Sequence, residues 1–230
     1  MMLLLVFAKQ HWPPKPAFEL ALPVRQAALH LTLGQLLFTG LMRVDLLALA
    51  TVGGDATQTA LYSAAARFAE VGFLLFAPVL NLLQLGLRQR QADRAKFLWY
   101  LTVLVLGAVA FAAVGMLVGG MAADWLVTLA FGNSFAEAAP LLAWLLGGLV
   151  LMLPGQVLAQ AAVALNRERA VWVAYAAGLL LTLVGAMVLV PGYGALGTAW
   201  AMLIGHGGVL LVLGVFMGKH FCHSGKENLT

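Results

Sequence analysis

Six long apolar stretches, separated by short polar connections, dominate the amino-acid sequence. A helix that crosses a bilayer needs about 20 predominantly apolar residues, because the hydrocarbon core is ~30 Å thick. Of the chain's residues 63% are hydrophobic and only 10% are charged, whereas about a quarter of a typical soluble domain is charged. We therefore predict an all-α fold, a polytopic membrane bundle of six transmembrane helices. Their expected ranges are Ala27–Val52, Ala56–Leu85, Phe97–Met121, Ala138–Leu165, Val171–Val190 and Ala195–Met217.

These stretches divide the chain into one large unit and two flanking segments. We expect an N-terminal stub with a cytoplasmic or interfacial segment over residues 1–26, a six-helix transmembrane lobe over 27–217, and a cytoplasmic tail over 218–230. The opening segment Met1–Ala8 is apolar but too short to span, and it lacks the basic region of a signal peptide. We interpret it as the end of a helix that begins before this chain, or as a short interfacial segment.

The basic residues of the connections gather on one side of the predicted membrane, while the other side holds only Asp55, Asp124 and Glu137. Because cytoplasmic loops are enriched in Lys and Arg, we expect both termini in the cytoplasm. The same asymmetry explains the net charge of +4, so we expect no nucleic-acid partner. The basic residues on the crowded side are Lys9, Lys15, Arg25, Arg88, Arg90, Arg94, Lys96, Arg167, Arg169, Lys219 and Lys226.

Four charged residues lie inside the first two apolar stretches: Arg43, Asp45, Arg67 and Glu70. A charge at the centre of a bilayer costs roughly 2.5–3.5 kcal/mol on insertion scales, so such residues are candidates for a functional site. Arg67 and Glu70 are three positions apart and can pair on one helix face. Arg43 and Asp45 lie about 200° apart around an ideal helix, so they do not simply pair with each other.

Polar residues extend from these charges along one face of each helix. In the second stretch the face contains Ser63, Arg67, Glu70, Asn81, Gln84 and Arg88, with Leu74 and Ala77 between them. In the first stretch it contains Thr32, Gln35, Thr39 and Arg43. Residues at this spacing share a helix face, and lipid would leave their polar groups unsatisfied. We therefore expect both faces to border a wet cavity or a polar partner.

Several features have simpler interpretations. Arg67 and Glu70 could form a neutral structural pair that only fixes helix packing. We interpret Gln156 and Gln160 as bonds between helices, and His206 as a satisfied packing histidine rather than a proton carrier. We recognise no nucleotide-binding fingerprint, catalytic triad, carboxylate pair or metal-ligand spacing, so we expect no enzyme activity, no cofactor and no metal site.

Three segments together resemble polysaccharide flippases of the O-antigen type. Met42–Val71 has an Asp late in one helix, a Gly-containing turn, and Tyr62, Ala65 and Arg67 in the opening of the next helix. Leu129–Leu145 is similar to an FG-x-x-F-x-x-A segment, and Asn166–His206 to a late hairpin with a Pro/Gly/Tyr/Gly turn. The order of these segments resembles the C-terminal lobe of this family, which belongs to the multidrug/oligosaccharidyl-lipid/polysaccharide exporter superfamily.

The resemblance implies a transporter that moves an undecaprenyl-pyrophosphate-linked oligosaccharide across the bacterial inner membrane by alternating access. Two lobes would enclose a cationic cavity, so the expected partners are the lipid-linked oligosaccharide, membrane lipids, and a second lobe, either an N-terminal half or another copy. By this analogy Arg43 and Arg67 would bind the pyrophosphate, and Asp45 or Glu70 would serve in ion coupling or gating. The remaining cavity residues would be Gln35, Asn81 and Gln84.

Other functions remain open at this stage. A drug or small-cation exporter of the same superfamily would favour carboxylates in its cavity, whereas two of the four charged residues in the first two apolar stretches are arginines. A membrane-embedded glycosyltransferase or polymerase would need a longer loop with catalytic carboxylates. A non-functional fragment would insert into the membrane without transporting anything.

Overall fold

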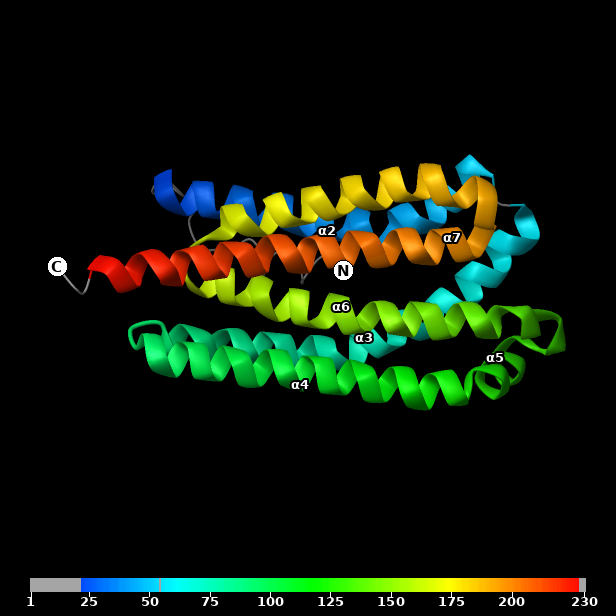
Figure 1. The fold of residues 1–230 in the computed structure, drawn as a ribbon, viewed down its shortest axis with the longest axis horizontal. Helices are drawn as coiled ribbons and strands as arrows, with labels where there is room; N and C mark the ends of the chain where they lie inside the picture. Colours follow the sequence, from blue (N-terminus) through cyan, green and yellow to red (C-terminus); the bar gives the residue numbers. More distant parts are fainter. Residues whose placement is uncertain (1–21, 54, 228–230) are drawn as a thin grey trace, which may run out of the picture.

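The computed structural model describes residues 22–53 and 55–227, and all of the regular structure there is helical (Figure 1). The expected segment 1–26 therefore lies mostly outside the described residues, as does the side chain of Asn81. The helices are α2 (Leu22–Val52), α3 (Ala56–Arg90), α4 (Arg94–Met121), α5 (Ala123–Phe131), the 3-10 helix η1 (Asn133–Ala138), α6 (Ala139–Ala164) and α7 (Glu168–Glu227).

Five of these helices, α2, α3, α4, α6 and α7, are long and apolar enough to cross a membrane. The expected fifth and sixth spans together form α7, which runs to one end of the bundle, turns, and runs back (Figure 1). Its backbone leaves the helical conformation at Gly194, where φ is 54° and ψ is −129°. The predicted all-α fold is thus confirmed, with the last two expected spans joined across this turn.

The turn in α7 is held from α3. The Gln58 side-chain carbonyl accepts a hydrogen bond from the Ala195 backbone N–H at 3.0 Å. Below the turn, glycines allow the two arms of α7 to approach closely: a methyl group added at Gly178 or Gly205 would collide with the opposite arm. Such small residues are typical of helix contacts inside membranes.

Helix α6 lies at the centre of the bundle. Helices α3 and α4 pack on it, α7 packs between it and α2, and most α6 side chains are buried. By contrast, α2 and α3 make few contacts with each other. This arrangement leaves the α2–α3 side of the bundle open, with α6 and α7 behind it.

The connection between α4 and α6 is more ordered than the sequence patterns indicated. The expected spans leave residues 122–137 as a connection, and this connection contains the nine-residue helix α5 and the six-residue helix η1. Ala123 and Val127 of α5 are buried, whereas Trp125 and Leu129 are exposed. A short helix with an exposed aromatic and apolar face suits a position at the membrane–water interface.

Charged connections segregate to opposite ends of the bundle. The α3–α4 turn, the α6–α7 connection and the end of α7 lie at one end, and the α2–α3 turn, α5 and the α7 turn lie at the other (Figure 1). The first end holds the basic residues Arg88, Arg90, Arg94, Lys96, Arg167, Arg169 and Lys219. This spatial separation agrees with the charge pattern, and the cytoplasmic placement of both termini stays a prediction.

Candidate functional site

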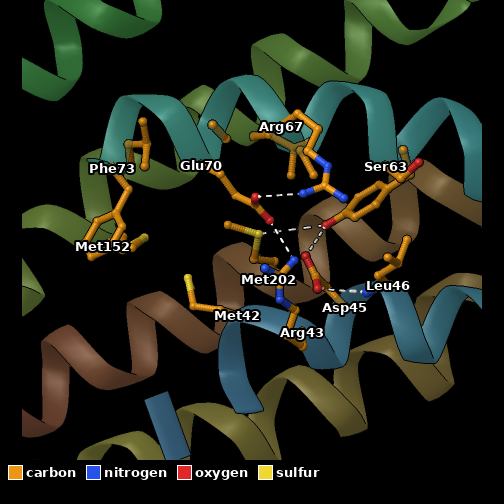
Figure 2. A pocket seen from close by; sticks show the side chains of 15 residues that line it. Met42, Arg43, Asp45, Leu46, Ser63, Arg67, Glu70, Phe73, Met152 and Met202 are labelled. Carbon is orange, nitrogen blue, oxygen red and sulfur yellow. Dashed lines mark hydrogen bonds and ion pairs between the residues drawn. The ribbon is translucent and has the colours of Figure 1, made fainter. Parts of the chain in front are cut away.

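The four charges inside the apolar stretches lie around one cavity on the open side of the bundle (Figure 2). Helices α2 and α3 supply the polar walls, and apolar side chains of α6 and α7, including Leu149 and Met202, form the floor. The cavity has a volume of about 70 Å³. Since a water molecule occupies about 30 Å³ in the liquid, this cavity has room for a few small molecules at most.

Glu70 forms ion pairs with both arginines. Its Oε1 atom lies 2.8 Å from Nη1 of Arg43, and its Oε2 atom lies 3.4 Å from Nη1 of Arg67. Figure 2 shows the three side chains converging between the helices, Arg43 from α2 and the other two from α3. The Arg43–Glu70 contact joins two helices, whereas the Arg67–Glu70 contact lies within one helix. One carboxylate therefore neutralises half of a doubly cationic cluster.

Asp45 borders the same cavity but forms no ion pair with the two arginines. The Tyr62 hydroxyl donates a hydrogen bond of 2.7 Å to its Oδ2 atom, and the Leu46 backbone N–H donates one of 2.7 Å to Oδ1. Both Asp45 and Tyr62 are buried, and the Tyr62 oxygen also lies 3.8 Å from Sδ of Met202. As the helix geometry predicted, Asp45 and Arg43 point to different neighbours.

The arginine–glutamate cluster is exposed on the surface of the described chain. The side chains of Arg43, Arg67 and Glu70 are 55%, 66% and 36% exposed. Arg43 lies nine residues before the end of α2 and Arg67 eleven residues after the start of α3, so the cluster is roughly 14–17 Å from those ends. Charges at this depth face hydrocarbon unless water or another polar surface covers them.

The local architecture explains why the charges converge. Because α2 packs against α7 and α3 packs against α6, the two helices diverge and present their polar faces toward a shared space. Tyr62 and Asp45 close the floor of that space with one hydrogen bond between α2 and α3. A long arginine side chain then bridges the remaining gap to Glu70.

The structure brings together some of the residues expected from the sequence and separates others. Arg43, Asp45, Arg67 and Glu70 all line the cavity, whereas Gln35 and Gln84 do not. Ser63 lies at the rim, and the side chain of Asn81 is outside the described set. Tyr62 was named only as part of a family motif, and its hydrogen bond to Asp45 was not anticipated. The signal was its position seven residues after Asp55, on a helix that returns past Asp45.

Two expectations about buried polar groups have different outcomes. Gln156 of α6 accepts a hydrogen bond of 3.1 Å from the Tyr175 hydroxyl of α7, so its predicted role as a bond between helices is confirmed. His206 is buried as expected, but its Nε2 atom has no hydrogen-bond partner among the described residues, so the description as a satisfied histidine is wrong.

Within residues 22–53 and 55–227, no three His, Cys, Asp or Glu side chains form a group that could hold a metal ion. The polar side chains that line the cavity are two guanidinium groups, two carboxylates, the phenol of Tyr62 and the hydroxyl of Ser63. Guanidinium groups match the geometry of carboxylates and phosphates, which makes an anionic group the natural ligand for the outer part of this cluster.

A comparison of the chain with protein-family models, with curated proteins and with solved structures found no match. The fold and the composition define the class: an all-helical protein with five helices that are long and apolar enough to cross a membrane.

Proposed function

We propose that this chain is one lobe of a membrane transporter that flips an undecaprenyl-pyrophosphate-linked oligosaccharide across the bacterial inner membrane by alternating access. The proposal combines the resemblance of Met42–Val71 and two later segments to polysaccharide flippases with the arrangement of charges on the open side of the bundle. The observation that supports it most directly is the pairing of Glu70 with both Arg43 and Arg67 at an exposed position within membrane-length helices.

The two arginines suit the pyrophosphate of such a substrate. Each guanidinium can donate two parallel hydrogen bonds to phosphate oxygens. The cavity holds two arginines and two carboxylates, but Asp45 is buried and bonded to Tyr62, so the exposed cluster of Arg43, Arg67 and Glu70 contains two positive groups and one negative group. A drug or small-cation exporter would need an excess of negative charge there, so the charge balance within the exposed cluster favours an anionic substrate.

Glu70 would act as the gate of this site. In the absence of substrate it neutralises the arginines, and an incoming pyrophosphate would replace it as their partner. The displaced carboxylate then loses both ion pairs, and the loss of the Arg43–Glu70 pair, which joins α2 to α3, shifts the balance between two arrangements of these helices. A ligand can move such an equilibrium only through different contacts in the two states, and this exchange of partners supplies them.

Asp45 fits the ion-coupling role better than Glu70 does. It is buried and forms its side-chain hydrogen bond with Tyr62 instead of an arginine, so a proton or small cation arriving there would not compete with the pyrophosphate for the same partners. Intramembrane carboxylates in such settings commonly take part in proton or ion pathways.

A second lobe is part of the proposal. The cavity of about 70 Å³ is far smaller than a lipid-linked oligosaccharide, and both arginines that line it are more than half exposed. Transporters built from repeats place the substrate site between two such units. An N-terminal half or another copy of this chain would cover the open side and complete the cavity.

The experiment that tests the site is a titration of the purified chain, in an uncharged detergent, with farnesyl pyrophosphate as a short isoprenyl pyrophosphate. We expect Arg67→Gln to weaken binding by about 10- to 100-fold, the effect of losing a charge-assisted hydrogen bond. Glu70→Gln should strengthen binding because it frees both arginines, and Gln35→Ala should change little. Unchanged binding in both Arg67→Gln and Glu70→Gln would rule out this site.

A test in cells separates the two transport functions. A strain that depends on this protein and contains Arg67→Ala should lose surface polysaccharide and keep its drug resistance. Lost resistance with unchanged polysaccharide would instead favour the drug or small-cation exporter. A strain in which neither changes would contradict a role of Arg67 in transport.

A further inference from the structure

A second cavity lies between the two arms of α7, at the opposite end of the helix hairpin from the Gly194 turn. It has a volume of about 440 Å³, several times that of the cavity at Glu70. Its lining combines three cationic and six apolar residues: Arg167, Arg169, Lys219, Ala170, Val173, Leu211, Val212, Val215 and Phe216. The proposed transport mechanism uses none of these residues.

The three cations are available for a ligand. Arg167 lies just before α7, Arg169 lies in its first turn and Lys219 lies near its end, so cations from both sides of the groove line its end at the basic end of the bundle. Among the described residues, the ion pairs within 4.0 Å involve only Arg43, Arg67 and Lys96, and none of the three groove cations. A single anionic group at the mouth would have three positive partners.

The rest of the groove is apolar and open to the surroundings of the bundle. Leu211 is 66% exposed, Val215 is 49% exposed and Val173 is 39% exposed. From Lys219 to Leu211 the groove follows α7 for roughly 12 Å, at 1.5 Å per residue. The cations thus lie at the end of the bundle and the apolar side chains lie deeper along it, the order of groups in a phospholipid that stands in one leaflet.

We propose that this groove binds an anionic phospholipid, with its phosphate between Arg167, Arg169 and Lys219 and one acyl chain along Val173, Leu211 and Val215. Basic pockets between transmembrane helices bind anionic headgroups by this combination of charge and apolar area. A zwitterionic lipid would fill the same apolar groove but would add its own cation next to three others. The bound lipid would connect the two arms of α7 at the end of the hairpin that lies away from the Gly194 turn.

The groove is independent of the transport site. It lies near the basic end of the bundle, whereas the Glu70 cluster lies toward the α2–α3 turn, and the two cavities share no lining residue. The proposed lipid site can therefore be tested independently of the substrate proposed above.

The test is a lipid titration of the purified full chain in an uncharged detergent, followed by native mass spectrometry. Dioleoylphosphatidylglycerol should be retained in preference to dioleoylphosphatidylcholine. The double variant Arg167→Gln/Arg169→Gln should weaken binding of the anionic lipid by about 30-fold, since each cation near a headgroup contributes about a factor of five. The control variant Arg88→Gln/Lys96→Gln removes the same charge from the same end of the bundle and should change binding by less than about threefold.

A further variant tests the apolar half of the site without altering its charge. Val215→Trp places a large side chain in the groove from an exposed position, so it should block the acyl chain and reduce binding while the helical circular dichroism spectrum stays unchanged. An equal loss of lipid binding in the Arg88→Gln/Lys96→Gln control would mean that the general surface potential, and not this groove, attracts the lipid, and it would overturn the proposal. Equal retention of both lipids, or full competition by glycerol 1-phosphate without acyl chains, would overturn it as well.

Discussion

At the scale of single residues, the hydrogen bond between Tyr62 and Asp45 is the buried polar contact between α2 and α3. Tyr62→Phe keeps the ring but leaves one oxygen of Asp45 without its donor. An unsatisfied buried acceptor costs about 1–3 kcal/mol, so we expect the free energy of unfolding to fall by that amount in a denaturant titration. In the double variant with Asp45→Ala the costs should not add, because both partners of the bond are then absent. Additive losses would show that the two side chains act independently.

Glu70 differs from Asp45 because its ion pairs are exposed. Ion pairs exposed to water contribute about 0–1 kcal/mol, so a cluster that borders a wet space predicts that Glu70→Gln changes the unfolding free energy of the chain by less than about 1 kcal/mol in detergent solution. This measurement decides between a functional cluster and a pair that only fixes helix packing. A loss of several kcal/mol would favour the structural pair, and Arg67→Gln should then be equally destabilising.

At the scale of elements, the turn inside α7 requires glycine at one position. Gly194 has φ 54° and ψ −129°, and a methyl group there would collide with the Gln58 side chain that holds the turn. We expect Gly194→Ala to cost about 1–3 kcal/mol in unfolding free energy, the usual cost of a strained backbone conformation. Gly192→Ala is the matched control, since it has open space around it and an ordinary φ. Similar losses in both variants would mean that the turn tolerates a side chain.

The start of α4 gives a pH-dependent prediction. Asp93 caps this helix: its carboxylate accepts a hydrogen bond from the Lys96 backbone N–H. This hydrogen bond holds the pKa of the Asp93 carboxyl below the usual value. A lowered folded-state pKa stabilises the folded chain above the unfolded pKa of about 3.9, and this stabilisation disappears as the pH falls through the folded pKa. Asp93→Asn keeps a capping side chain that does not titrate. The melting temperatures of the two proteins should therefore converge as the pH falls below about 4, and a constant difference would contradict the linkage.

The sequence patterns predict elements better than contacts between them. Apolar length alone defines the membrane-length helices, since a run of about 20 apolar residues has few other stable structures. The sequence patterns did not predict the nine-residue helix α5 because it is short and lies in a connection. The Arg43–Glu70 pair joins residues 27 positions apart, so it depends on the tilt and rotation of two helices, which packing against α6 and α7 determines. The hydrogen bond of Tyr62 to Asp45 was not predicted because the sequence around a tyrosine does not show whether its hydroxyl has a partner.

At the scale of the whole molecule, the open α2–α3 side conflicts with immersion in lipid. Helices on the other sides expose apolar residues such as Leu106, Leu117 and Met187, which suit hydrocarbon. The α2–α3 side instead exposes two arginines and a glutamate at mid-depth. A chain surrounded by lipid on every side would leave these charges without water, so the assembled protein needs a wet space or a polar partner there.

This requirement can be tested in native membranes with single cysteines on α3, in a Cys222→Ser background. Ser63 and Ala66 line the cavity at the arginines, whereas Leu75 and Val79 are on the apolar face and are themselves exposed, at 68% and 41%. Surface exposure alone therefore predicts labelling at Leu75→Cys and Val79→Cys as well, while a wet cavity predicts labelling only at Ser63→Cys and Ala66→Cys. A charged thiol reagent pays at least ~2.5 kcal/mol to enter hydrocarbon, so the rates on the two faces should differ by about 100-fold. Equal slow rates on both faces would mean that protein, not water, covers the arginines, which would leave no space for a substrate.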